Sequence, residues 1–233
     1  MSRSLIAALC TFAIVIALSL TASAQTSATT PWSDDALNLR MAYPADLVKA
    51  DPAEVMHDGN LVLFGVSGDT DSQLAASTHC LRPNLVLQMA PSAQPTTATI
   101  LLAELDIDCL TSEEQVNSKN LLPTMAEAVN KVPGMKPITQ PTWYNIGWQK
   151  VHMAAAQGQP QTRQGTGSPT GTSQQLFTMG ISTIWNNHLL VWYFSSNNIE
   201  TLNRITKTTV RFGRAAAAPL YPVTMGNATP SLQ

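Results

Sequence analysis

The chain has 233 residues, a length that fits one domain or at most two. Hydrophobic residues make up 44% of it and charged residues only 12%, so it can fill a core but has an unusually uncharged surface. The formal net charge is −2 and the sequence holds no run of Lys and Arg, which excludes the electrostatic pattern of a nucleic-acid-binding protein.

The first 24 residues have the pattern of a secretory signal peptide. Arg3 supplies a short positive region and residues 5–20 an apolar region. Residues 22–24 (Ala-Ser-Ala) form a small-residue cleavage site before Gln25. An uncleaved membrane anchor is the alternative, but the apolar run is short for a span. The pattern therefore predicts a periplasmic or secreted protein with no membrane span after cleavage.

Two cysteines remain after such cleavage, Cys80 and Cys109. An even count in an oxidising compartment predicts one disulfide. A metal site is the alternative, because His79 adjoins Cys80, and Asp106 and Asp108 lie close to Cys109. Neither group has the spacing of a zinc knuckle, and adjacent residues of a strand point to opposite faces. The disulfide is therefore the preferred interpretation.

The first half of the chain predicts strands. Residues 25–35 are rich in Thr and Ser and predict a disordered lead before a single globular domain over 36–213. Alternating apolar residues over 37–43 predict a first strand, which Pro44 ends. Further apolar runs predict strands over 61–66, 84–89 and 97–107.

The middle of the chain predicts a helix, a strand and a loop. Thr111 and Glu114 have the spacing of a capping box, and apolar residues at helical spacing continue to Val132, with a break expected at Pro123. Residues 143–156 predict one long strand with a bulge near Gln149. Residues 157–174 are rich in Gly, Ser, Thr and Gln and predict a flexible loop.

Residues 175–196 give the strongest structural signal. Two runs rich in β-branched and aromatic residues flank Asn186-Asn187, a pair that tolerates positive φ and so predicts a two-residue hairpin turn. Trp185 then lies opposite His188. We expect the bulkier face of the hairpin to form the core, with helices packed on it. That face consists of Phe177, Met179, Ile181, Thr183, Trp185, His188, Leu190, Trp192 and Phe194, and the thinner face includes Tyr193.

After the hairpin, Asn197 predicts the cap of a second helix over 198–212, which Gly213 ends. Residues 214–233 hold an Ala run and three prolines and predict a disordered tail. Strands, helix, strands and helix in this order predict an α+β fold, an antiparallel β-sheet flanked by helices.

Several of these segments together resemble the PsbP-like fold. They are a strand that ends in an aromatic-Pro step (LRMAYP), a mid-chain helix, a strand with an Ile-Gly step (NIGWQKVHMAAA), the long apolar hairpin and the closing helix. The resemblance covers most of residues 37–213. It implies an α/β/α sandwich and no catalytic residue, because proteins of this fold mostly serve as binding or assembly modules.

No catalytic motif of a hydrolase, metalloprotease or nucleotide-binding enzyme occurs in the chain. His57, His152 and His188 are interpreted as solvent-facing residues. We therefore predict no catalytic residue and no cofactor.

Three acids, Glu104, Asp106 and Asp108, share one parity of a predicted strand. They are the candidate metal ligands, since hard cations prefer clustered oxygens, and a solvated acidic face is the simpler interpretation.

Three functions from different classes follow. The first is an exported non-enzymatic binding or assembly module with another exported protein as the candidate partner, which an exposed Tyr193 would favour. The second is a small-molecule or cation-binding protein that uses the three acids. The third is an enzyme with a site assembled from distant residues, which a cleft joining a histidine to a carboxylate would favour.

Overall fold

The computed structural model describes residues 28–52, 80–90, 95–159 and 175–225. The predicted signal peptide, the predicted strand over 61–66 and most of the predicted loop over 157–174 lie outside these residues. In the described part, no helix is long and apolar enough to cross a membrane.

Two antiparallel sheets and two helices make up this part of the chain. The larger sheet has the strand order β3-β4-β5-β9-β8-β7-β6, and the smaller has the order β1-β2-β10-β11. The strands are β1 (Thr29–Asp34), β2 (Leu39–Pro44), β3 (Leu47–Lys49), β4 (Leu81–Met89), β5 (Ala98–Asp106), β6 (Met135–Ile146), β7 (Gln149–Gly158), β8 (Leu176–Trp185), β9 (His188–Ser196), β10 (Thr209–Phe212) and β11 (Ala218–Pro219). The helices are α4 (Ser112–Lys131) and α5 (Ile199–Ile205), and the 3-10 turn η4 (Ile107–Cys109) precedes α4.

The predicted central hairpin is confirmed as β8 and β9. Trp185 pairs with His188 and Ile184 pairs with Leu189, as the proposed register requires. Asn186 and Asn187 both have positive φ, 47° and 61°, because the hairpin turns that match strand twist need such values.

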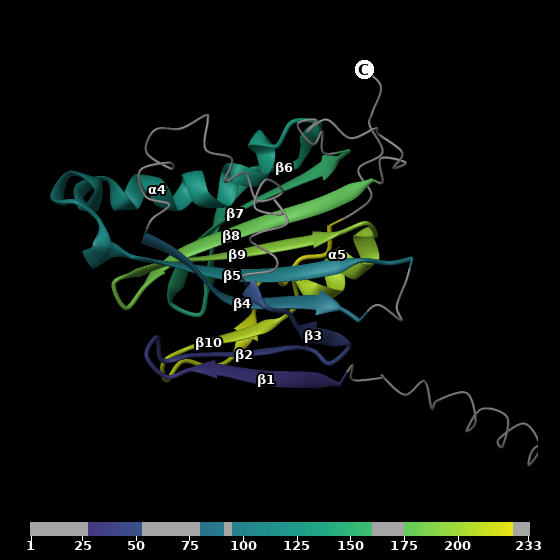
Figure 1. Cartoon of the computed structure of the whole chain (residues 1–233), viewed down its shortest axis with the longest axis horizontal. Coiled ribbons are helices and arrows are strands. Elements are labelled where there is room, and N and C mark those ends of the chain that lie inside the picture. The colour runs from purple at the N-terminus through teal and green to yellow at the C-terminus, as the bar shows by residue number, and fades with distance from the viewer. Residues whose placement is uncertain (1–27, 53–79, 91–94, 160–174, 226–233) are drawn as a thin grey trace, which may run out of the picture.

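The seven-stranded sheet lies between two different layers (Figure 1). Its bulkier face packs against the four-stranded sheet and α5, and its thinner face packs against α4. The expectation of helices on the bulky face is confirmed in part, because α5 packs there, but most of that face is covered by the second sheet. The side chains on the thinner face are small because α4 lies very close to it. A Cβ on Gly180 would lie 2.3 Å from the carbonyl oxygen of Ala126.

Disorder was wrongly predicted at both ends of the domain. Residues 29–34 form β1, which pairs along β2, and Trp32 packs against the core. Beyond Gly213, Leu220 and Tyr221 are buried and their backbone N–H groups donate to the carbonyls of Thr208 and Thr206. Thr, Ser and Ala composition is typical of loops, but here a few large apolar residues fix these segments to the core.

Three predicted segments have different shapes in the structure. Residues 143–156 do not form one strand, because Gly147 has a φ of 61° and closes a two-residue turn between β6 and β7. Pro123 lies inside a continuous α4, where Leu121 and Met125 on either side of it are buried. Helix α5 begins after Asn198, not Asn197, and ends at Ile205.

The last predicted turn of that helix, over 209–212, is strand β10, which pairs with β2. Its side chains alternate between half-buried and buried, with Val210 and Phe212 in the core. Period-two alternation and β-branched residues favour a strand here over a further helical turn.

Candidate functional site

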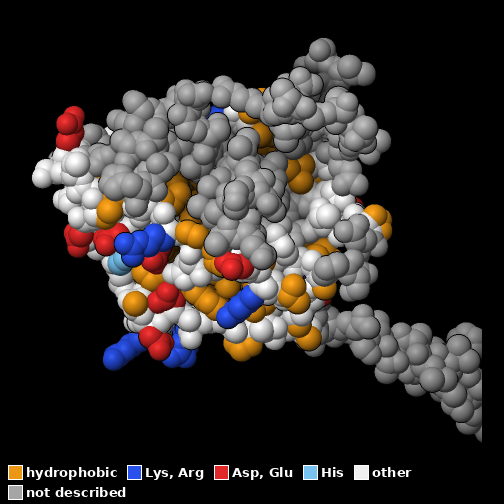
Figure 2. Space-filling view, viewed as in Figure 1, with side chains coloured by type: hydrophobic (Ala, Val, Ile, Leu, Met, Phe, Trp, Pro, Cys, Tyr) orange, Lys and Arg blue, Asp and Glu red, His pale blue; other side chains and the backbone are white. Residues whose placement is uncertain are grey.

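The candidate acids lie at the end of the molecule where the strands turn. Figure 2 shows acidic, basic and histidine side chains gathered on the left side of the molecule, where the β8–β9 turn lies in Figure 1. Glu104 and Asp106 both come from β5, where Asp106 pairs with His188 of β9. Because His188 shares a face with Leu190 and Trp192, these acids face the space between the two sheets.

A bulge in β4 connects the two sheets through one amide. The register between β4 and β5 shifts between Pro83 and Leu85, so that Asn84 is left without a partner residue. Its side-chain Nδ2 donates to Oδ2 of Asp34 and to Oε2 of Glu104, at 3.0 Å in each case. Asp34 belongs to the small sheet and Glu104 to the large one. A bulge re-aims a side chain, and here it directs an amide to a carboxylate on each sheet.

The hydrogen bonds to Asp34 stabilise its charged form. Burial alone would raise the pKa of the Asp34 carboxyl group, but the Asn84 amide and the backbone N–H groups of Leu37 and Ala36 donate to it, and His188 lies nearby. The pKa of Asp34 is therefore below its ordinary value. The Asp34 carboxylate therefore stabilises the folded chain at pH values above its pKa in the unfolded chain. This stabilisation is lost as pH falls through its lower pKa in the folded chain.

We expect Asn84→Ala to lower the free energy of unfolding by about 1–2 kcal/mol at pH 7, because two carboxylates lose their shared donor. The difference from the wild-type chain should begin to shrink as pH falls below about 4, and it should be smallest once pH is below the lowered pKa of Asp34 in the folded chain. Urea unfolding at several pH values measures both effects. Gln88→Ala, on the same strand, is the control, and an equal loss in the two variants would contradict a specific role for Asn84.

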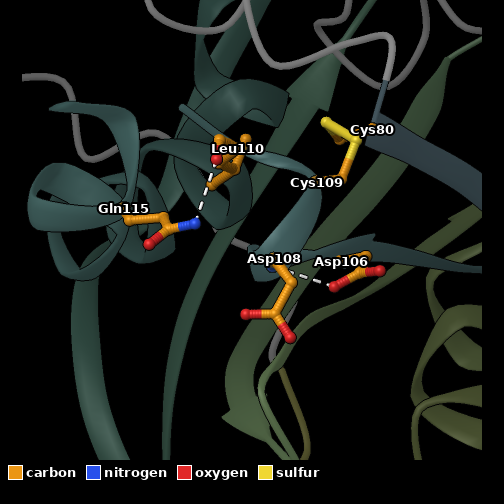
Figure 3. Close-up of a disulfide and its surroundings, with 6 residues drawn as sticks. All are labelled: Cys80, Asp106, Asp108, Cys109, Leu110 and Gln115. Atoms are coloured by element: carbon orange, nitrogen blue, oxygen red, sulfur yellow. Dashed lines mark hydrogen bonds between the residues drawn. A yellow bond between two sulfur atoms is a disulfide. The ribbon is translucent and has the colours of Figure 1, made fainter. Parts of the chain in front are cut away.

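The three candidate metal ligands make separate contacts. Glu104 binds the Asn84 amide, whereas Oδ1 of Asp106 accepts the backbone N–H of Asp108 at 2.9 Å and caps η4 (Figure 3). Asp108 is exposed. Within the described residues, no three side chains of the metal-ligating types lie close enough to hold an ion. These contacts do not assemble the cation site that the spacing of the acids suggested.

Cys80 and Cys109 form the predicted disulfide (Figure 3). It ties the start of β4 to the end of η4, with the Cα atoms 5.8 Å apart. Closing a loop of about 30 residues stabilises the folded chain by roughly 3.5 kcal/mol in the chain-entropy description. Next to it, the Gln115 side chain donates to the carbonyl of Leu110 and holds the first turn of α4.

His152 lies in the interior, where the prediction placed it toward solvent. Its Nε2 is 2.8 Å from Oε1 of Glu127 on α4, and its ring contacts that of Trp143 at a tilt of 54°, with centroids 4.6 Å apart. Its Nδ1 is buried without a hydrogen-bond partner. A histidine beside a carboxylate is the pairing that the enzyme hypothesis required. The histidine side chain is only 5% exposed but the Glu127 side chain is 37% exposed, so the pair joins α4 to the sheet with its carboxylate partly open to solvent.

Tyr193 is not an exposed aromatic residue. It is buried beneath α4, where its hydroxyl donates to the carbonyl of Met125 at 2.7 Å. Burial raises the pKa of this hydroxyl above its ordinary value. An exposed Tyr193 would have favoured a binding surface on this face of the sheet, and the structure does not show one.

The exposed aromatic residues lie instead on the β6–β7 hairpin. Trp148, in its two-residue turn, is 65% exposed, and Trp143 on the edge strand β6 is 44% exposed. Trp148 contacts Trp185 with the two rings tilted by 50° and their centroids 5.3 Å apart, and Nε1 of Trp185 donates to the carbonyl of Leu37 at 2.6 Å. Sequence reasoning missed this surface because it interpreted residues 143–156 as one strand. The Ile-Gly-Trp step was the signal for a turn.

No protein-family model matches the chain, and no curated protein matches it in sequence. Among solved structures it is similar to cyanobacterial PsbP (CyanoP) from Synechocystis sp. PCC 6803, with 11% identity and a TM-score of 0.37, over 74% of this chain and 82% of that chain. It is also similar to LpqN, involved in cell envelope biogenesis of Mycobacterium tuberculosis, with 12% identity and a TM-score of 0.37, over 80% and 87%. The chain thus has a weak structural likeness to a PsbP protein, at a level that carries no inference about function.

Proposed function

We propose that the protein is an exported, non-enzymatic binding module that engages another exported protein through its β6–β7 hairpin. Export is supported by the predicted signal peptide and by the Cys80–Cys109 disulfide, which suits an oxidising compartment. The observation that carries the proposal is Trp148, a large indole at 65% exposure in the two-residue turn between β6 and β7.

The position of Trp148 suits recognition because its support is already ordered. Its partner Trp185 is hydrogen-bonded to Leu37 and also makes an edge-on contact with the ring of Phe212, which is buried. An aromatic anchor that is held before binding loses little conformational entropy on binding. Tryptophan is also among the residues that most often dominate the energy of protein interfaces.

Charge and backbone geometry define the partner further. The hairpin from Met135 to Gly158 carries Lys136 and Lys150 and no Asp or Glu, and Nζ of Lys150 lies 4.5 Å from the centroid of the Trp143 ring. Within the described chain, β6 pairs only with β7, so its outer edge is open. Pro137, Pro141 and two register shifts interrupt that edge. We therefore expect a partner with an apolar pocket for the indole and an acidic rim, and not a simple added strand.

The test uses a photo-crosslinking amino acid in place of Trp148 in the full-length chain, made in cells that naturally produce it. Position 148 should crosslink to one protein, and the same substitution at Val48, also exposed but on β3, should not. The purified partner should then bind the Trp148→Ala variant at least about 30-fold more weakly, with thermal stability nearly unchanged. Equal crosslinking from both positions, or equal affinity of the variant, would overturn the proposal.

A further inference from the structure

A second exposed surface, independent of the β6–β7 hairpin, lies on the outer face of the four-stranded sheet. Leu39 and Met41 of β2 and Phe212 of β10 point into the core. The residues between them therefore point outward, and these include Arg40 and Arg211. The two arginines are directly opposite each other, and Ser33 of β1 lies opposite Arg40. We call these three residues the arginine row.

Two like charges face each other in the arginine row without compensation. Like charges at opposed positions of neighbouring strands destabilise a sheet. In the part of the chain that the structure describes, neither Arg40 nor Arg211 has a carboxylate within ion-pair distance, whereas Arg204 is paired with both oxygens of Asp46 at 2.7 Å. Nε of Arg211 is also buried without a hydrogen-bond partner.

This positive surface cannot be seen in the sequence, because Arg40 and Arg211 are 171 positions apart in the chain (211 − 40). Their strands, β2 and β10, are nevertheless adjacent in the sheet. Arg214 follows shortly after β10 and is exposed. Figure 2 shows Lys and Arg side chains in the lower part of the molecule, where the four-stranded sheet lies in Figure 1. In a chain with only 12% charged residues, such a group of arginines needs a physical reason.

A pocket of about 290 Å³ adjoins the row and is lined by Pro31, Trp32, Ser33, Arg40 and Met41. We infer that the arginine row and this pocket bind a phosphate group. Adjacent strands are about 4.8 Å apart, so both guanidinium groups reach one tetrahedral oxyanion between them. Each guanidinium donates in a planar fork that matches phosphate oxygens, and the Ser33 hydroxyl offers a further donor.

The charge balance favours phosphate over carboxylate. A phosphate dianion neutralises both arginines and turns their mutual repulsion into attraction to a shared ligand. A carboxylate neutralises only one of them. The phosphate is either free or part of a small ester, or belongs to a lipid headgroup, and the experiment separates these sources.

The experiment follows thermal unfolding and calorimetric binding of the full chain with inorganic phosphate, against chloride at equal ionic strength. Phosphate should raise the melting temperature in a saturable way, and Arg40→Gln or Arg211→Gln should weaken binding at least about tenfold. Arg211→Lys should retain part of the affinity. Without phosphate, Arg40→Gln should unfold at the same or a higher temperature than wild type, because a repulsion is removed; a merely structural arginine would give a lower temperature.

Lys136→Gln is the matched control, since it removes one exposed positive charge from a different sheet. It should bind phosphate like the wild-type chain. Vesicles of phosphatidic acid, compared with neutral vesicles, form the second arm: binding to them and not to free phosphate assigns the site to a lipid headgroup. If phosphate acts no differently from chloride and neither vesicle binds, or if Lys136→Gln abolishes binding equally, the inference is wrong. The Trp148→Ala variant should bind phosphate normally, so this result stands apart from the proposed protein partner.

Discussion

Trp192→Ala and Tyr193→Ala should each lower the free energy of unfolding by about 3–5 kcal/mol, although the two side chains point to opposite faces of the same strand. Trp192 has no exposed area and Tyr193 only 1%. The Trp192 ring meets Phe212 of the four-stranded sheet, with centroids 6.2 Å apart, and Tyr193 binds the backbone of α4. Each truncation leaves a cavity beneath a covering layer, in addition to the lost transfer free energy.

Urea unfolding of the oxidised chain measures both losses. Tyr193→Phe keeps the ring and removes only the hydroxyl that donates to Met125, so it should cost about 1 kcal/mol. Trp148→Ala, at an exposed position, provides the control for loss of an indole. A cost for Tyr193→Ala well below that for Trp192→Ala would mean that α4 does not cover its face of the sheet in solution.

Gly180→Ala should destabilise the chain by about 3 kcal/mol, an unusually large effect for one added methyl group. The new Cβ would lie 2.3 Å from the carbonyl oxygen of Ala126 and 3.0 Å from its carbonyl carbon. These are backbone atoms of α4, which move only if the helix moves. The displaced helix would also loosen the contact between Glu127 and His152.

Gly147→Ala separates crowding from backbone strain. Gly147 has a positive φ of 61°, but a Cβ there meets no atom within 4 Å. Its substitution should cost about 1–2 kcal/mol from the left-handed conformation alone. Unfolding curves for both variants test the contrast, and a cost for Gly180→Ala no larger than that for Gly147→Ala would contradict the close approach of α4.

The layers on both sides of the large sheet also restrict where a partner binds. Neither face of β8 or β9 is open. A partner can therefore bind only at the edges of the large sheet, at the turns, or on the outer face of the small sheet. The exposed indole of Trp148 and the two opposed arginines, Arg40 and Arg211, lie on such surfaces. We propose them as separate sites, and the matched variants above distinguish them.

The sequence by itself determined the features that depend on neighbouring residues. Asn186-Asn187 between two apolar runs was enough for the register of β8 and β9, because that turn needs two residues with positive φ. The pairing of Cys80 with Cys109 followed from an even cysteine count in a chain whose sequence predicts export. Strands β4 and β5 followed from their apolar runs, since burial imposes such patterns locally.

Only the tertiary structure decided the features that depend on long-range contacts. Periodicity shows that Trp192 and Tyr193 face opposite ways, but not that a second sheet covers one and a helix the other. The acids Glu104 and Asp106 could be chosen from the sequence, whereas Asn84 joins Glu104 to Asp34 through a bulge that depends on pairing with β5. Arg40 and Arg211 likewise meet because β2 and β10 pair across the whole domain. Hydrophobic burial selects which strands pair, and it is set by the packing of the entire chain rather than by any local pattern.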